Sequence, residues 1–322
     1  MFQRAWRERI AGFNKRCRGV IDGFTGGSST EDEREALVSE YFQGYVEAGS
    51  KRWWYAVAHP VLSARAFNHF MKLPRLVAEL SPSAGGQAIW DGLGRDRPRI
   101  ETPVHRAASV LVLPDQPGEY SQGRRRQTLR RKCREAERRG VRWRLVTDPA
   151  ERKRLVALAD QRDRSHPRDE YRVTEGTRRN LLVHPLMLLG YADGDRPILV
   201  SITPTDGRWA ILQYFRTLED TPESSAARYL LSEALAEELV GRGVKYLADN
   251  ASPMGINSGL RHFQRMLGFR IFRVDRVRLD HTPARVRRLR PIDRPSGLSG
   301  LKEPNQAAPH AVPNAARSVL GA

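Results

Sequence analysis

The chain has 322 residues and a formal net charge of +18, because 55 Lys and Arg residues outnumber 37 Asp and Glu residues. Its 40% hydrophobic and 29% charged residues are typical of a globular protein and exclude collagen-like, fully disordered and disulfide-framework chains. The apolar run from Leu181 to Gly190 is too short to span a bilayer, and the first residues lack the apolar core of a leader. The two cysteines, Cys17 and Cys133, lie in Arg-rich surroundings, which favours a reducing cytoplasm.

The positive charge is concentrated in one segment. Residues 121–145 contain eleven Lys or Arg and two Glu, a net charge of +9 that is half the excess of the whole chain. A field of this strength attracts phosphate groups, nucleic acid or anionic lipid headgroups.

Composition divides the chain into four parts. We expect a basic helical region at 1–50, an N-terminal subdomain at 51–120, a principal domain at 121–290 and a disordered tail at 291–322. Apolar residues at helical spacing predict a helix from Glu31 to Ala48. The aromatic and cationic run from Lys51 to Val57 suits a membrane surface, a stacked base or a hydrophobic core.

Residues 81–103 are rich in Gly, Pro and Ser and predict loops around a short strand near residues 88–90. Residues 108–113 predict a buried strand. A basic helix is expected from Gly123 to Arg139, with Leu129, Cys133 and Ala136 as its apolar stripe, and a strand is expected at 141–146.

The second half of the chain predicts a meander followed by alternating helices and strands. Runs at 188–192, 197–203 and 209–218 are separated by Asp-Gly pairs, a strong hairpin signal. A helix begins after Thr221, and then come a strand at 244–249, a helix at 257–267 and a strand at 269–279.

The connection from Glu219 to Ala227 is a candidate anion site. A helix that follows a strand directly presents unpaired backbone N–H groups and the positive end of its dipole. Small side chains here would let a ligand approach the backbone, and Arg228 adds positive charge. A routine helix start explains the same residues.

This arrangement resembles the GNAT N-acyltransferase superfamily. The resemblance rests on the strand Ile211 to Leu218, the turn to Ala227, the helix to Val240, the strand Val244 to Asp249 and the segment Asn257 to Phe269 with its closing Leu-Gly-Phe. It implies an α+β fold, with a mixed, mostly antiparallel twisted sheet flanked by helices and a helical N-terminal extension.

The resemblance also implies a binding site for acyl-coenzyme A, with acetyl-coenzyme A as the expected form. The cofactor pyrophosphate would lie on the turn, the pantetheine would pair with the strand, and the last helix would touch the cofactor's arm. The residues carried over by resemblance are Phe215, Arg216, Thr217, Ser224, Ser225, Ala226, Ala227, Arg228 and Asn257. The sequence departs from the pattern in two ways, because the turn lacks glycines and Gln264 replaces a proton-donating tyrosine.

The upstream strand and basic helix narrow the resemblance to CelD-like acetyltransferases and Fem-type aminoacyltransferases. In the Fem-type case the donor is an aminoacyl-tRNA, whose phosphates the helix would bind. In the acetyltransferase case the helix would hold an anionic acceptor or the 3′-phosphate of the cofactor. The alternative to both cases is that the helix presents a solvated cationic face without a ligand. The candidate anion-binding residues are Arg124, Arg125, Arg126, Arg130, Arg131 and Lys132.

An amine must lose a proton when it attacks an acyl donor, so a base is required. Asp249 at a strand end is the first candidate, followed by Tyr214 and His262. Scattered histidines and the lack of a Cys-x-x-Cys pair argue against a metal site, and no metal is expected.

The sequence therefore predicts an N-acyltransferase that moves an acyl group from acyl-coenzyme A to an amine-bearing acceptor by direct attack. The alternatives are an aminoacyl-tRNA-dependent Fem-type transferase and a non-catalytic nucleic-acid or anionic-surface binder. The expected location is the cytoplasm, with peripheral contact to the membrane as a further option.

Overall fold

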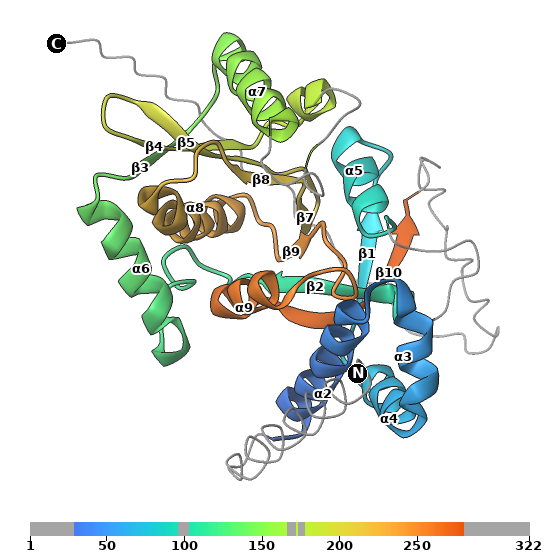
Figure 1. Ribbon diagram of the computed structural model, residues 1–322. Coiled ribbons are helices and arrows are strands. Elements are labelled where there is room, and N and C mark those ends of the chain that lie inside the picture. Colours follow the sequence, from blue (N-terminus) through green and yellow to red (C-terminus); the bar gives the residue numbers. More distant parts are fainter. Residues whose placement is uncertain (1–28, 96–102, 166–171, 173–177, 280–322) are drawn as a thin grey trace, which may run out of the picture. The chain divides into compact units, whose positions relative to one another are not determined.

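The computed structural model describes residues 29–95, 103–165, 172 and 178–279 (Figure 1). All of these residues fall within one compact unit of the chain. The predicted tail at 291–322 and most of the predicted basic N-terminal region lie outside the described residues.

Three N-terminal helices pack together before the first strand. They are α2 (Ser29–Glu47), α3 (Arg52–Ala58) and α4 (Pro60–Met71). Phe42 of α2 and Phe70 of α4 are fully buried, and they form a cluster with Ile271 of the last strand. The helix expected from Glu31 to Ala48 is therefore present as α2, and its apolar stripe attaches the helical layer to a sheet.

A six-stranded mixed sheet has the order β1-β10-β2-β9-β7-β6. Its strands are β1 (Arg75–Leu80), β2 (Ala107–Val112), β6 (Thr205–Asp206), β7 (Trp209–Leu212), β9 (Tyr246–Asp249) and β10 (Arg270–Arg278). The pairs β1–β10 and β7–β9 are parallel, and the other three pairs are antiparallel. Helix α5 (Ala84–Gly92) contacts β1, β6 and β7.

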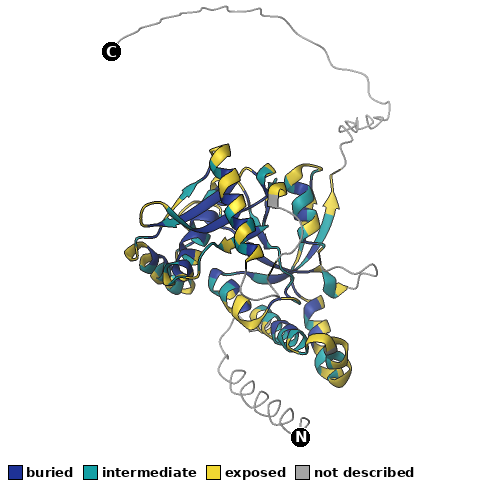
Figure 2. Cartoon of the chain, turned by 45° about the horizontal axis from the view of Figure 1, so that its top comes forward, coloured by how far each residue is buried: buried dark blue, intermediate teal, exposed yellow. Residues whose placement is uncertain are grey.

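A four-stranded antiparallel sheet has the order β3-β4-β5-β8. Its strands are β3 (Arg142–Leu145), β4 (Met187–Ala192), β5 (Arg196–Ile202) and β8 (Tyr214–Thr217). Side chains alternate between its two faces, so Leu188 packs toward α8 (Pro222–Gly241) whereas Leu189 packs toward α7 (Pro149–Arg164). Helices thus cover both faces, and the buried strands lie between them (Figure 2).

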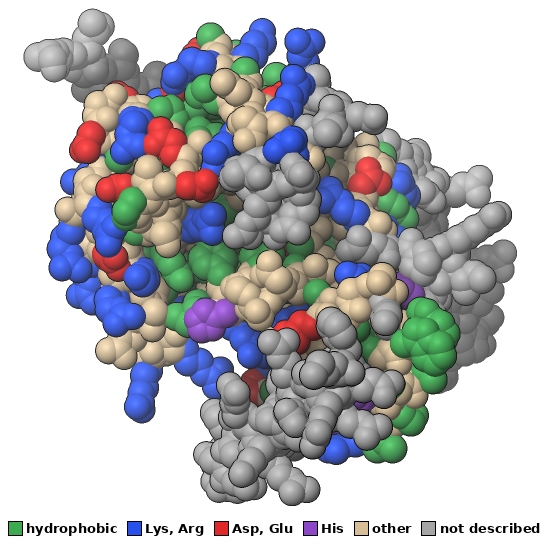
Figure 3. Space-filling model, in the orientation of Figure 1, with side chains coloured by type: hydrophobic (Ala, Val, Ile, Leu, Met, Phe, Trp, Pro, Cys, Tyr) green, Lys and Arg blue, Asp and Glu red, His purple; other side chains and the backbone are tan. Residues whose placement is uncertain are grey.

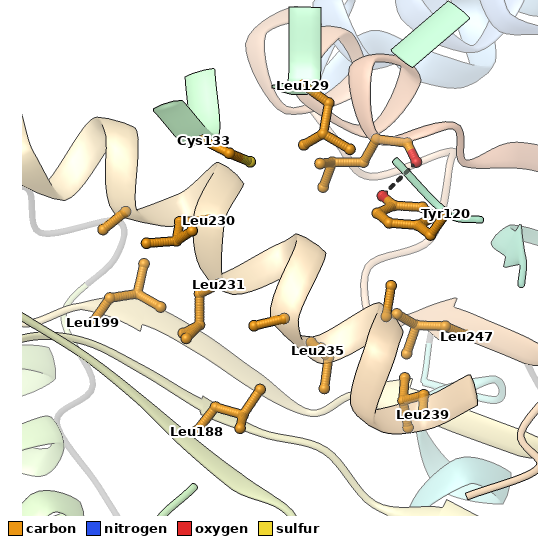
Figure 4. Close-up of a cluster of buried hydrophobic side chains, with 14 of the residues drawn as sticks. Tyr120, Leu129, Cys133, Leu188, Leu199, Leu230, Leu231, Leu235, Leu239 and Leu247 are labelled. Atoms are coloured by element: carbon orange, nitrogen blue, oxygen red, sulfur yellow. Dashed lines mark hydrogen bonds between the residues drawn. The ribbon is translucent and has the colours of Figure 1, made fainter. Parts of the chain in front are cut away.

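Helix α8 forms the centre of the largest core. Leu231, Leu235 and Leu239 project from it between the four-stranded sheet and α6 (Gln127–Arg138), which contributes Leu129 and Cys133 (Figure 4). The predicted stripe of α6 is confirmed, because Leu129, Cys133 and Ala136 are its buried residues. The α+β fold with a mixed, mostly antiparallel sheet arrangement, flanking helices and N-terminal helices is confirmed as well.

Two local predictions were wrong. Residues 88–90 lie in α5 and not in a strand, because Ser83 caps that helix by accepting a hydrogen bond from the Gly86 N–H at 2.9 Å. The run 209–218 is not one strand, since it divides at Gln213 into β7 in the six-stranded sheet and β8 in the four-stranded sheet. Strand β5 therefore pairs with β8, and a β6–β7 hairpin lies between them in the chain.

Candidate functional site

The division of the chain at Gln213 separates β8 from β9. Strand β7 pairs with β9 in parallel as far as Leu212 and Asp249, and the next strand, β8, turns away to pair with β5. Strand β8 is the last strand of its sheet, so its second edge carries no strand among the described residues. An open strand edge beside a diverging neighbour is a place where an extended ligand can pair with the backbone.

A cavity of about 320 Å³ lies at the end of β9. It has the volume of a small substrate site. Its walls come from α2, α3, β2 and the loop after β9, and the lining residues are Tyr45, Arg52, Gly92, Leu93, His105, Ala107, Ala108, Asp249, Ala251, Ser252, Met254 and Gly255. Segments from both ends of the described chain thus build one site.

Asp249 is the acidic residue in this lining. The Ala251 N–H donates a hydrogen bond to Oδ1 at 2.8 Å, and the Gln264 Nε2 donates one to Oδ2 at 2.8 Å. Burial raises the pKa of Asp249, and these hydrogen bonds oppose the rise. A carboxylate with a raised pKa beside a cavity has the property that a general base needs.

Gln264 of α9 (Ser258–Leu267) fixes this carboxylate in place. Its side chain is buried, and its Oε1 accepts a hydrogen bond from the Ser109 hydroxyl of β2 at 3.0 Å. Because Oε1 faces a donor, the amide nitrogen faces Asp249. Gln264 therefore orients the carboxylate and cannot supply a proton itself.

The loop that closes one side of the cavity is held by a buried arginine. Arg261 donates to the Pro253 carbonyl at 2.8 Å and to the Ser39 hydroxyl of α2 at 3.3 Å. Burial is the main cause that lowers the pKa of Arg261 to about 10, and the neighbouring Arg265 adds to it. This arginine connects α2, α9 and the loop, so it gives the cavity a fixed wall.

Tyr45, Arg52 and His105 were missed by sequence reasoning. Arg52 lies in the run from Lys51 to Val57, which was noted only for other roles, and Tyr45 and His105 carry no sequence signal; long-range packing brings all three to Asp249. Arg52 lies over the Tyr45 ring, 5.9 Å from its centroid. A cation and a carboxylate in one cavity lining suit a polar substrate group.

The two weaker catalytic candidates lie elsewhere. Tyr214 is buried in the core between the four-stranded sheet and α7, and His262 is exposed on α9. Neither is among the described residues that line the cavity. A catalytic role for either residue stays a prediction.

The predicted pyrophosphate turn has mixed exposure. Ser224, Ala226 and Ala227 are buried, whereas Ser225 and Arg228 are exposed. The Thr221 hydroxyl accepts a hydrogen bond from the Ser224 N–H at 3.3 Å, so one of the free N–H groups already has a partner.

Carboxylates surround the same turn. Glu219 pairs with Arg196 and Asp220 pairs with Arg162. Glu223 lies in the first turn of α8, and hydrogen bonds to its own backbone N–H and to the Thr221 side chain hold its pKa below the usual range. Arg196 and Arg162 offset two of these three carboxylates, so Glu223 is the acidic group in the first turn of α8 that would oppose an anion there.

The other residues carried over for coenzyme A lie on β8 and α9. Phe215 packs against the main core, Arg216 is exposed and Thr217 is partly exposed. Asn257 is the N-cap of α9 and accepts a hydrogen bond from the Leu260 N–H at 2.9 Å. Their roles toward a cofactor stay predictions.

The predicted anion-binding set divides into two groups. Arg124, Arg125 and Arg131 are exposed, and Figure 3 shows Lys and Arg side chains gathered over α6. Arg126 lies 4.7 Å from the centroid of the Tyr120 ring, Arg130 donates to the carbonyls of Ser121 and Gly123, and Lys132 pairs with Glu135. Arg134 and Arg138 are exposed on the same helix and extend the cationic face, although the sequence analysis did not select them.

No protein-family model and no curated protein matches the chain. Solved structures do match it. L-PGS from Bacillus licheniformis is 14% identical with a TM-score of 0.40, and the match covers 52% of this chain and 59% of that one. The C-terminal domain of a putative lysylphosphatidylglycerol synthetase from Agrobacterium fabrum is 14% identical with a TM-score of 0.35, covering 44% of this chain and 45% of that one.

A conserved protein of unknown function from Bacteroides thetaiotaomicron is 11% identical with a TM-score of 0.40, covering 58% of this chain and 64% of that one. In each match less than two thirds of the other chain is covered. The protein is thus structurally similar, over about half its length, to L-PGS.

Two features are absent from the described residues. None of their helices combines the length and the apolar character that a bilayer crossing requires. In the same part of the chain, no three His, Cys, Asp or Glu side chains gather in a way that would hold a metal ion.

Proposed function

We propose that this protein transfers an aminoacyl group from aminoacyl-tRNA to an acceptor nucleophile, with Asp249 as the general base. The observation that carries the proposal is the cavity at the end of β9, where a carboxylate with a raised pKa is held by Gln264 and Ala251. Such a carboxylate accepts a proton at a pH closer to neutrality than a free Asp does.

The surface charge supports tRNA as the donor. Arg124, Arg125, Arg131, Arg134 and Arg138 are exposed along η3 (Arg124–Arg126) and α6, and this basic face suits a polyanion that contacts many cations at once. The α8 turn lacks glycines and its Ser224 N–H already bonds to Thr221, which counts against the pyrophosphate of coenzyme A at that turn.

The chemical step follows from the position of Asp249. An acceptor amine in the cavity gives a proton to the carboxylate while its nitrogen attacks the carbonyl carbon of the aminoacyl ester. A C–N bond forms and the ester C–O bond breaks. The ribose oxygen of the tRNA leaves as a hydroxyl group and takes up the proton that Asp249 accepted. Arg52 and His105 line the same cavity and would orient the polar end of the acceptor.

The test measures where a labelled amino acid goes. The protein is incubated with tRNA charged with labelled amino acids and with acceptors of two kinds, small amines and phospholipids with a free hydroxyl. We expect label in the acceptor fraction, its loss after ribonuclease treatment of the tRNA, and a roughly 100-fold or larger fall with Asp249→Asn. Transfer by Asp249→Asn at the wild-type rate would remove Asp249 from the mechanism.

Acyl-coenzyme A as the donor is the second candidate. It is supported by the open edge of β8, because pantetheine has amide groups that pair with an extended strand. Acetyl-coenzyme A at about 100 times its Kd should stabilise the fold by about 2.7 kcal/mol. Such stabilisation, abolished by Ser225→Glu and accompanied by acetyl transfer that ribonuclease does not affect, would replace the tRNA-dependent reaction.

A non-catalytic binder is the remaining alternative. It predicts steep salt dependence of tRNA binding together with no transfer from either donor to any acceptor. The same labelled assay, run beside a tRNA binding titration, separates this outcome from the two transferase reactions.

A further inference from the structure

Helix α3 exposes its aromatic side chains. Trp53 is 58% exposed and Trp54 is 54% exposed, and their rings stack with centroids 4.2 Å apart. None of the described side chains of α3 is buried. Figure 3 shows a cluster of hydrophobic side chains at the place of α3. The indoles therefore do not belong to the core that the sequence analysis considered for this run.

Helix α4 continues this surface. Ala66 and Phe70 of α4 are buried, whereas Val61 is 72% exposed and Phe67 and Met71 are exposed as well. Helices α3 and α4 contact each other and both contact α2. Two adjacent helices thus keep large apolar side chains in solvent, and such a surface in a soluble protein usually marks an interaction site.

The charge of this segment has one sign. From Ala48 to Ala78 the sequence contains no Asp or Glu, and it contains Lys51, Arg52, Arg65, Lys72 and Arg75. Arg52, Arg65 and Lys72 are exposed, and Arg75 pairs with Asp275. Exposed tryptophans next to exposed cations match the interface of a bilayer with anionic headgroups, because indoles favour the headgroup level and cations favour the negative surface.

We propose that α3 and α4 form a docking surface for an anionic lipid bilayer. Trp53 and Trp54 insert at headgroup level, and Arg65 and Lys72 contact lipid phosphates. This proposal does not depend on the transfer reaction, since it concerns binding alone.

A bilayer fits the surface better than a nucleic acid does. Trp53 and Trp54 alone would suit stacked bases, but Val57, Val61 and Met71 are aliphatic and have no planar ring to stack on a base. Aliphatic side chains gain free energy when they leave water for acyl chains. The apolar and basic residues together therefore favour lipid.

Docking also has a geometric consequence for the cavity. Arg52 begins α3 and lines the cavity that contains Asp249. Binding through Trp53 and Trp54 brings this wall of the cavity to the bilayer surface.

The test uses the full-length protein and vesicles, without any acyl donor. Sedimentation compares neutral phosphatidylcholine vesicles with vesicles that contain about one third phosphatidylglycerol. We expect the wild type to sediment with anionic vesicles, the double variant Trp53→Ala/Trp54→Ala to bind at least tenfold more weakly, and Arg65→Ala/Lys72→Ala to lose about fivefold per cation at low salt. Brominated lipid should quench the tryptophan fluorescence of the wild type, and the extent of this quenching should be smaller in the double tryptophan variant.

Matched controls separate docking from unspecific effects. Trp143→Ala removes a partly exposed indole on β3, and Lys153→Ala/Arg154→Ala removes two exposed cations on α7; both should bind vesicles like the wild type. Equal binding to neutral and anionic vesicles, or wild-type binding by Trp53→Ala/Trp54→Ala, would overturn the proposal. A third result would also overturn it: the wild type forms a dimer and does not bind vesicles, and Trp53→Ala/Trp54→Ala abolishes the dimer. The surface would then hold a second copy of the chain.

Discussion

Gln264 on α9 donates a hydrogen bond to Asp249 at the end of β9, and the two side-chain atoms lie 2.8 Å apart. Ser109 of β2 holds the other end of the same amide. The Asp249 carboxylate is therefore set by two elements besides its own strand. Removing one of these two hydrogen bonds should change the proton affinity of Asp249 and leave the fold in place.

The variant Gln264→Leu removes the donor that favours the ionised carboxylate. Because this hydrogen bond lowers the pKa of Asp249 against the effect of burial, its loss should raise the pKa further. The base is active when deprotonated, so the acid limb of the pH profile of kcat should move to higher pH. Initial rates of aminoacyl transfer between pH 5 and 9 measure this shift.

Ser109→Ala is the matched control for Gln264→Leu. It removes the hydrogen bond to Gln264 Oε1 and leaves the donor to Asp249 in place. We expect a smaller shift of the acid limb with a comparable cost in stability, about 1 kcal/mol. Identical pH profiles for the wild type and Gln264→Leu would show that Gln264 does not tune the base.

The raised pKa of Asp249 also predicts a pH dependence of stability. As pH rises above about 3.9, the usual pKa of Asp, the carboxyl group ionises in the unfolded chain while the folded protein keeps its proton. The free energy of unfolding should therefore fall until the folded-state pKa is passed. Asp249→Asn lacks this contribution, so its stability relative to the wild type should increase with pH across this window.

Urea denaturation of both proteins at several pH values measures the difference. Other carboxylates contribute equally to both proteins, and their effects cancel when the two free energies are subtracted. A difference that stays constant from pH 4 to 8 would contradict a raised pKa.

The cationic face of α6 predicts a salt dependence for tRNA binding. Each phosphate contact contributes roughly 0.7 to 0.9 to the slope of log K against log salt concentration. Arg131→Ala/Arg134→Ala should therefore lower the slope by about 1.5 and weaken binding at low salt. Filter binding at several salt concentrations measures the slope, with Lys153→Ala/Arg154→Ala on α7 as a control of equal charge.

Gly268 ends α9 in the left-handed conformation, with φ of 84°, and its N–H bonds to the Arg265 carbonyl at 2.9 Å. A Cβ at this position would collide with the Arg126 guanidinium. The guanidinium is the end of a flexible side chain and can move, but it then leaves the Tyr120 ring, so Gly268→Ala should cost the roughly 1 kcal/mol of backbone strain and a small excess for this lost contact.

Gly118→Ala is the control for Gly268→Ala. Gly118 has the same φ of 84°, and a Cβ there would meet no atom within 4 Å, so this variant reports backbone strain alone. Adding Arg126→Ala to Gly268→Ala should recover the excess over Gly118→Ala in urea denaturation. If Gly268→Ala destabilises the protein no more than Gly118→Ala does, the Arg126 side chain moves aside without a cost in stability.

Much of the fold could be predicted because its signals are local. The single apolar stripe of α6, the Asp-Gly turns at Gly194 and Gly207 and the Thr221 cap of α8 are each visible within a few residues, and each has a physical cause that the structure bears out. The division at Gln213 could not be predicted, because the residues on both sides have strand character and their partners, β9 and β5, lie far away in the sequence.

The candidate site was predicted only in part. Asp249 was selected because it ends a strand, and it does line the cavity. Arg52, His105 and the orienting role of Gln264 depend on contacts between segments far apart in the sequence, such as Ser109 and Gln264, which are 155 residues apart. The spacing of residues along the sequence does not indicate such contacts.

A single residue, Gln213, connects β7 of the six-stranded sheet to β8 of the four-stranded sheet. Helix α8 covers the four-stranded sheet, and the core around α8 also includes residues of the six-stranded sheet. Strands β7 and β8 are continuous in the chain, so a change in one sheet is transmitted to the other. The two sheets should therefore melt as one cooperative unit. A one-residue insertion at Gln213 would change the relative facing of β7 and β8, so this junction tolerates side-chain replacement better than a change of length.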